Sequence, residues 1–168
     1  MRSQVLYTQA TCETCLACNL LINSKRNIRV AKDVELDVLN HALRFSKYNF
    51  TIGHLDYMAR KYGVKINWFV EGRLSYSHIR KKAIHRNVSV YKRKINIPFV
   101  DSLLKKSSVI LYLDSYVLYG IHHYPHFITV AGKRGKSYKI IDPWDGRIKI
   151  VGVRTLSRGI ILMTSSPE

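Results

Sequence analysis

The amino-acid sequence predicts an α+β fold in which an N-terminal layer of helices packs on a C-terminal antiparallel β-sheet. Helical periodicity fills the first third of the chain, and segments rich in β-branched and aromatic residues follow it. Because the helices come first and the strands afterwards, the chain lacks the alternation typical of a parallel α/β sheet. At 168 residues the chain is long enough to bury a core, and we expect residues 1–168 to form one domain.

Three helices are expected in the first third. CLACNLLINS (15–24) is short and mostly apolar, and AKDVELDVLNHALRFSKY (31–48) places its apolar residues mainly on one stripe. In TIGHLDYMARKYG (51–63), Thr51 is a suitable N-cap and Gly63 stands where a C-cap is needed. These helices are expected to form one packed layer.

Strands dominate the remainder of the chain. VKINWFVEG (64–72) alternates and carries β-branched and aromatic residues, and VSVYKRKINI (88–97) predicts a further strand or hairpin. Pro98 opens a short helix, PFVDSLLKK (98–106). The later strands are expected in SSVILYLD (107–114), in the two halves of HFITVAGKRGKSYKIIDPWDG (126–146), in RIKIVGV (147–153) and in RGIILM (158–163).

Composition excludes several classes of protein. Apolar residues make up 46% and charged residues 23%, the balance of a globular rather than a disordered protein. The most apolar segment, VILYLDSYVLYGI (109–121), is interrupted by Asp114 and is too short to cross a membrane, and MRSQVLYTQ (1–9) lacks the apolar core of a secretion signal. We therefore expect a cytoplasmic protein that does not contact a membrane. Its odd number of cysteines argues against a disulfide framework.

The strand pair around the turn GKRGK (132–136) is expected to bring a histidine and a carboxylate together. The midpoint between His126 and Asp142 falls at Arg134, inside that turn. Positions equidistant from a hairpin turn lie opposite each other, so both side chains should meet at one end of the sheet, within one register step. A histidine facing a carboxylate suits a general base, because the acid fixes its tautomer and stabilises the imidazolium. Trp144 is expected in the core, or alternatively packed under this pair.

A thiol can supply the nucleophile for this pair. Cys15 stands where the helical run LACNLLI (16–22) begins, so we expect its sulfur near the positive end of the helix dipole, where a thiol is acidified. Gln9, six residues earlier, is placed to donate its amide to a developing oxyanion. Together with His126 and Asp142, these residues form a complete set for acyl transfer.

These motifs resemble those of papain-like cysteine peptidases. Gln-x5-Cys near the N-terminus, a late His-Phe at a strand start and Asp-Pro-Trp at a hairpin end are similar to the bacteriocin-processing, double-glycine leader branch and its stand-alone relatives. The resemblance implies a papain-like fold, a peptide or protein substrate and no cofactor. It implies Cys15 as nucleophile, His126 as base, Asp142 as orienting acid and Gln9 as oxyanion-hole donor. The motif around the nucleophile is TCL where the branch usually has DCG, and related acyltransferases use the same triad.

The other cysteines leave an alternative open. Cys12 is expected to precede the helix, and Cys18, one turn after Cys15, is expected to pack in the core. The spacing of the three cysteines also fits a metal or iron–sulfur site. The ligands of such a site would be Cys12, Cys15 and Cys18 with His122, His123 or His126. A metal-binding protein is therefore an alternative, although it leaves the glutamine and the carboxylate without a role.

The chain carries a formal net charge of +17, with 28 lysines and arginines against 11 acidic residues. Such an excess attracts nucleic acid, acidic proteins or other anionic partners. Seven of the cations lie between Arg80 and Lys94, in a stretch without acidic residues that contains Tyr91 and follows Tyr76. A solvated surface is the simplest interpretation. The alternative is a non-catalytic papain-like module that binds nucleic acid or an acidic partner through this stretch.

Overall fold

The computed structural model describes residues 11–24, 30, 32–45, 50–82 and 85–166. In chain order, the elements are α1 (Cys12–Ser24), α2 (Lys32–Phe45), α3 (Phe50–Tyr62), β1 (Lys65–Val70), α4 (Arg73–Arg80), β2 (Val88–Lys92), α5 (Ile97–Leu104), β3 (Val109–Asp114), α6 (Tyr116–Tyr119), β4 (Pro125–Arg134), β5 (Ser137–Ile141), β6 (Ile148–Gly152), α7 (Val153–Leu156) and β7 (Ile161–Ser166). Within the described ranges, the structure has no helix that is long and apolar enough to span a membrane.

Helix α1 begins earlier than the sequence predicts, because Thr11 caps it. The Thr11 hydroxyl accepts the backbone N–H of Thr14 at 3.1 Å, and the Cys15 N–H donates to the Thr11 carbonyl at 3.2 Å. The expectation that Cys12 precedes the helix is therefore wrong, since Cys12 is its first residue. Cys15 lies about one turn inside the helix instead of at its end.

The other two N-terminal helices pack closely on each other. Helix α3 begins at Phe50, so Thr51 lies inside the helix and is not its N-cap, whereas Gly63 has the positive φ of 64° expected after a helix end. At Gly53, a Cβ atom would lie 2.8 Å from the Cα of Ala42 in α2. Only a glycine therefore allows α3 to approach α2 this closely.

A seven-stranded sheet follows, in the order β2-β1-β7-β3-β4-β5-β6. The predicted antiparallel pairing is found for every pair of strands except β1 and β2, which are parallel. The parallel pair arises because α4, a helix that the sequence reading missed, carries the chain back from the end of β1 to the start of β2. The predicted short helix α5 is confirmed.

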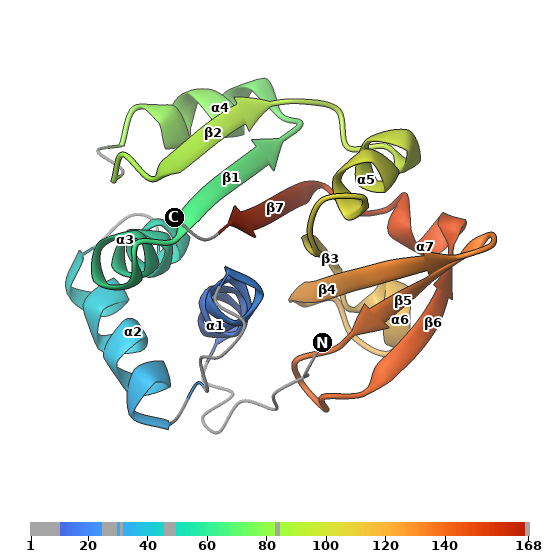
Figure 1. Ribbon diagram of the computed structural model, residues 1–168, viewed down its shortest axis with the longest axis horizontal. Coiled ribbons are helices and arrows are strands. Elements are labelled where there is room, and N and C mark those ends of the chain that lie inside the picture. The colour runs from blue at the N-terminus through green and yellow to red at the C-terminus, as the bar shows by residue number, and fades with distance from the viewer. Residues whose placement is uncertain (1–10, 25–29, 31, 46–49, 83–84, 167–168) are drawn as a thin grey trace.

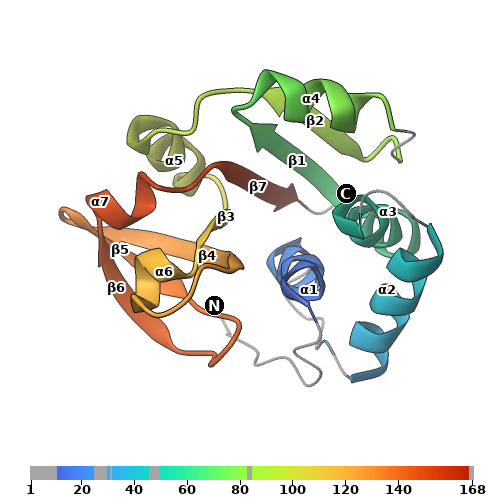
Figure 2. The ribbon, with the colours of Figure 1, turned by 180° about the vertical axis from the view of Figure 1, so that it is seen from behind.

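Helices cover both faces of the sheet (Figure 1 and Figure 2). Helix α1 packs between α3 and the sheet, in a core cluster that includes Ile110, Phe127 and Met163. Helices α5 and α7 cover the opposite face, in a second cluster that includes Leu111 and Ile128. Because side chains alternate along a strand, neighbouring residues of β3 and β4 belong to different clusters.

Candidate functional site

The predicted histidine and carboxylate meet at the end of the β4–β5 hairpin that lies away from the turn. His126 is the second residue of β4 and Asp142 is the first residue after β5, and their Nε2 and Oδ1 atoms lie 3.1 Å apart. The two side chains are 1% and 0% exposed. Because a carboxylate only accepts hydrogen bonds, Nε2 carries the proton, and Nδ1 of the neutral ring is left as the acceptor for another proton.

The register of the hairpin differs from the one that the spacing predicted. Arg134 pairs with Ser137, so the turn lies at 135–136 instead of at Arg134, and a further irregularity follows between 130 and 132. If the pairing of Thr129 with Ile141 is continued to the end of the strands, the position opposite His126 is that of Trp144, two residues beyond Asp142. The two side chains are therefore diagonal neighbours on one face of the sheet, a separation that a histidine and a carboxylate can still bridge.

The carboxylate of Asp142 also binds three donors that the sequence reading missed. The backbone N–H of Trp144 donates to Oδ1 at 2.9 Å, and Lys149 Nζ donates to Oδ2 at 2.9 Å. The Tyr119 hydroxyl donates to Oδ2 as well, and Lys149 donates to that hydroxyl at 2.9 Å. Tyr119 comes from α6 and Lys149 from β6. In the sequence, the one sign of their role was a lysine placed between two isoleucines of a predicted strand.

These surroundings keep the imidazole neutral. Burial of the ring, and then the positive charge of Lys149, lower the pKa of His126 to about 4, and the negative charge of Asp145 opposes this only in part. Lys149 also forms an ion pair with Asp145 at 3.1 Å, so it is held between two carboxylates. At neutral pH, His126 is therefore an uncharged base.

Trp144 lies against the histidine instead of in the core. Its ring centroid is 4.7 Å from that of His126, and it stacks on Tyr119 with centroids 6.0 Å apart and an angle of 16° between the ring planes. The side chain is 37% exposed. The preferred expectation of a core position is wrong, and the alternative position beside the pair is the one found. Here the indole shields His126 from solvent.

The three cysteines follow one another along α1 and become more buried toward its middle. Cys12 is partly exposed, Cys15 is 2% exposed, and Cys18 is fully buried in the core as predicted. Burial is the main cause that raises the pKa of Cys12 to about 11 and that of Cys15 to about 12. Burial also raises the pKa of Cys18. The expected acidification of Cys15 by the helix end is therefore wrong, because its sulfur lies about one turn inside a buried helix.

The thiols and the imidazole approach each other from opposite faces of the sheet. Helix α1 packs on the face that carries Phe127, whereas the preceding residue, His126, points to the other face. Helix α1 contacts the strand that carries His126 at the first residue of β4, where the Cys12 sulfhydryl donates to the Pro125 carbonyl at 2.7 Å. Burial is the main cause that raises the pKa of Cys12 and Cys15, and the negative charge of Asp142 adds a smaller contribution, so both thiols lie within electrostatic reach of the acid.

A hydrogen-bonded chain fixes the start of α1 against α3. His54 is fully buried, and its Nδ1 donates to the Phe50 carbonyl at 2.8 Å, so its Nε2 accepts the Thr14 hydroxyl at 3.0 Å. The Thr14 hydroxyl is also 3.0 Å from that of Thr11. Burial lowers the pKa of His54 to about 4, which keeps this ring neutral too. The residue before Cys15 is thereby held in one position.

Two further predictions concern Gln9 and a metal site. Gln9 lies outside the described residues, so its proposed contact with an oxyanion stays a prediction. Among the described residues, no three His, Cys, Asp or Glu side chains are grouped as metal ligands. His123 instead pairs with Asp114 at 2.6 Å on an exposed loop. The metal-binding alternative therefore finds no support in this part of the chain.

Comparison with solved structures gives a match in fold. The chain is similar to a double-glycine motif protease from an AMS/PCAT transporter, solved in complex with a leader peptide. The TM-score is 0.50 at 14% sequence identity, and the match covers 99% of this chain and 94% of the other. No protein-family model matches the sequence, and comparison with curated proteins finds no relative. The similarity is one of fold, and it agrees with the α+β architecture that the sequence predicts.

Proposed function

We propose that this chain is a cysteine-dependent peptidase formed by a single papain-like domain. The observation that carries the proposal is the buried His126–Asp142 pair at the start of β4, with Nδ1 of the histidine left as a proton acceptor. The fold shared with a double-glycine motif protease supports the same reaction class. A thiol-bearing helix packed against the strand that carries the histidine supplies the third component.

In the proposed mechanism, His126 acts as a general base toward a neutral thiol. Once the first turn of α1 has moved to bring the sulfur within reach of Nδ1, the sulfhydryl proton passes to Nδ1 as the sulfur attacks the substrate carbonyl, and Asp142 stabilises the imidazolium that forms. The protonated His126 then returns the proton to the leaving amine, which leaves a thioester on the enzyme. Water, deprotonated by the same histidine, hydrolyses this thioester and releases the second product. Gln9 is the proposed donor to the oxyanion.

Cys15 is the proposed nucleophile, on the strength of its six-residue spacing from Gln9. Cys12 is the second candidate, because it is more exposed and its sulfur already contacts the residue before His126. Catalysis by Cys15 requires α1 to shift its first turn so that substrate reaches a side chain that is 2% exposed. Single alanine variants at the two positions separate these assignments.

The proposed substrate is a peptide that contains a double glycine. The solved structure of similar fold is a double-glycine motif protease in complex with a leader peptide, and the part-exposed indole of Trp144 beside His126 would admit a backbone with small side chains more easily than one with large ones. Glycines let a peptide backbone pass close to bulky rings where a larger side chain would clash.

The test is cleavage of synthetic peptides with a central Gly-Gly, followed by mass spectrometry. The wild-type chain is expected to cleave after the second glycine. The cleavage rate should fall by about a thousandfold or more in His126→Ala and in Cys15→Ala. Cys18→Ala is the matched control, since Cys18 is a core thiol that should not take part. Cleavage that survives in Cys12→Ala, Cys15→Ala and His126→Ala alike would refute the proposal.

A further inference from the structure

A long segment of the chain carries only positive charge. Residues 72–100 contain eight lysines and arginines and no aspartate or glutamate. This segment forms α4, the turn after it, β2 and the loop into α5. The nearest acidic residues in sequence are Glu71 and Asp101, which flank the segment.

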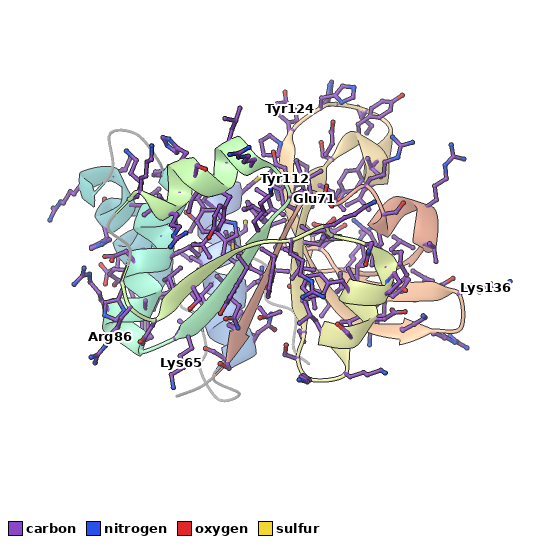
Figure 3. The ribbon with its side chains drawn as sticks, turned by 90° about the horizontal axis from the view of Figure 1, so that it is seen from above. Lys65, Glu71, Arg86, Tyr112, Tyr124 and Lys136 are labelled. Carbon is purple, nitrogen blue, oxygen red and sulfur yellow. The ribbon has the colours of Figure 1, made fainter. Side chains whose placement is uncertain are left out.

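The structure gathers these cations at one edge of the sheet. Strand β2 is an edge strand of the sheet, where its neighbour among the described strands is β1, and α4 packs beside it. The exposed cations, which we call the basic edge, are Arg73, Arg80, Lys81, Arg86, Lys92, Arg93 and Lys94. Figure 3 looks onto this side, with Lys65 and Arg86 where β1 and β2 begin and Glu71 beyond the end of β1. In Figure 1, α4 and β2 lie at the top, away from β5, β6 and α6, which surround Asp142.

An exposed aromatic ring lies on β2 itself, on the face of the sheet opposite to the one that α4 covers. Tyr91 is 45% exposed, and it stacks on Phe69 of the adjacent strand with ring centroids 5.2 Å apart and an angle of 21° between the planes. Phe69 in turn meets Phe99 edge to face, and the Arg93 guanidinium lies 4.3 Å from the centroid of Phe99. The tyrosine is thus held in one orientation by a packed aromatic group, which is how a rigid stacking platform is built.

A shallow depression adjoins Tyr91. It has a volume of about 520 Å³ and is lined by Glu71, Lys92, Arg93 and Lys94. The one acidic residue in it, Glu71, accepts the backbone N–H of Ile95 at 2.5 Å. Three cations against this one carboxylate leave the lining with a formal charge of +2, which favours an anionic ligand.

We propose that the basic edge binds single-stranded nucleic acid. Phosphates would contact the cations of β2 and, around its free edge, those of α4, while a base would stack on Tyr91; cations beside an aromatic ring are typical of proteins that bind single strands. A duplex offers its bases no aromatic contact of this kind, and an acidic protein needs the cations but not the exposed ring. This surface is separate from the His126–Asp142 pair, so the inference does not depend on the proposed peptidase activity.

The test measures fluorescence anisotropy of a labelled single-stranded 20-mer with the whole chain at several salt concentrations. Tyr91→Leu keeps an apolar side chain on Phe69 but removes the aromatic face, and it should weaken binding about tenfold, whereas Tyr91→Trp should keep the affinity. Replacing Lys81, Lys92 and Lys94 by glutamine removes three phosphate contacts. The slope of log K against log salt should then fall by about 2.

The control removes the same charge elsewhere. Lys106, Lys136 and Lys139 are exposed lysines outside the basic edge, and their replacement by glutamine should change affinity much less. Four results would overturn the inference: no binding at low salt, equal losses in the two triple variants, an unchanged affinity in Tyr91→Leu, or equally tight binding of a duplex or of polyglutamate. The last result would assign the surface to anions in general.

Discussion

Lys149 is the side chain whose removal should change the candidate base most specifically. It shares the carboxylate of Asp142 with His126, at 2.9 Å from Oδ2, while the imidazole lies 3.1 Å from Oδ1. The change Lys149→Met removes its charge and keeps most of its length. Because a positive charge beside a histidine disfavours the imidazolium, removing it should raise the pKa of His126 above its value of about 4.

The size of this shift follows from the separation of the two groups. One carboxylate bridges the two groups, so Lys149 Nζ and His126 Nε2 lie within about 8 Å of each other. At that distance a unit charge disfavours the imidazolium by about 2 kcal/mol at an effective dielectric of about 20. Lys149 is 27% exposed, and partial screening by solvent reduces the expected shift to about 1 pKa unit. Lys149→Arg keeps the charge and should leave the pKa of His126 close to 4.

The assay is a titration of the histidine Cε1–H signals by two-dimensional NMR, with His126→Gln to assign the signal. Lys139→Met is the matched control, since Lys139 lies on the adjacent strand β5 and is exposed. The reasoning is refuted if the pKa of His126 is the same in Lys149→Met as in the wild type. It is also refuted if Lys139→Met shifts that pKa equally, because the effect would then come from net charge.

Three further predictions concern thiol reactivity, acid stability and helix packing. Iodoacetamide should alkylate Cys12 before Cys15 and Cys18, and only slowly below pH 9, because burial raises the pKa of every thiol. Peptide mapping locates the alkylated cysteine, and fast alkylation of Cys15 at pH 6 would contradict this prediction. The pKa of His54 is lower in the folded chain than in the unfolded chain, so the unfolded state binds the extra proton as the pH falls. The free energy of unfolding should therefore decrease from pH 6.5 to about pH 4, and this residue contributes up to about 1.4 kcal/mol per pH unit. Urea unfolding of His54→Gln should show a shallower pH dependence, and an unchanged slope would refute the assignment. Gly53→Ala should lower the free energy of unfolding by about 1–3 kcal/mol because its Cβ meets the backbone of Ala42, whereas Gly132→Ala, where a Cβ has open space, should have a smaller effect in the same urea titration.

Local patterns in the sequence predicted the parts of the site that lie within one hairpin. His126 and Asp142 are joined by two strands and one turn, so their meeting depends on spacing that can be read directly. The diagonal offset was not readable, because it comes from a two-residue turn and an irregularity whose positions the sequence pattern leaves open. The start of α1 was missed because Thr11 caps it through Thr14, without the glutamate of the usual capping motif.

Contacts between distant segments were beyond reach of the sequence. Tyr119 and Lys149 reach Asp142 from two other elements, and nothing in local periodicity connects them. The parallel pairing of β1 with β2 was missed because α4, which makes it possible, is a helix of only eight mostly polar residues with a single buried residue, Ile79. The placement of the thiols and the imidazole on opposite faces of the sheet likewise depends on tertiary packing.

The most direct test of the proposed peptidase is covalent capture by a peptide vinyl sulfone that ends in Gly-Gly, at neutral pH. The adduct is located by intact-protein mass spectrometry and peptide mapping. Because the bound peptide, unlike iodoacetamide, is expected to shift the first turn of α1, the account predicts one adduct, on Cys15, that is lost in His126→Ala and retained in Cys18→Ala. An adduct on Cys12 that still requires His126 would move the nucleophile by one turn of α1. An adduct formed equally without His126, or none in the wild-type chain, would contradict the account.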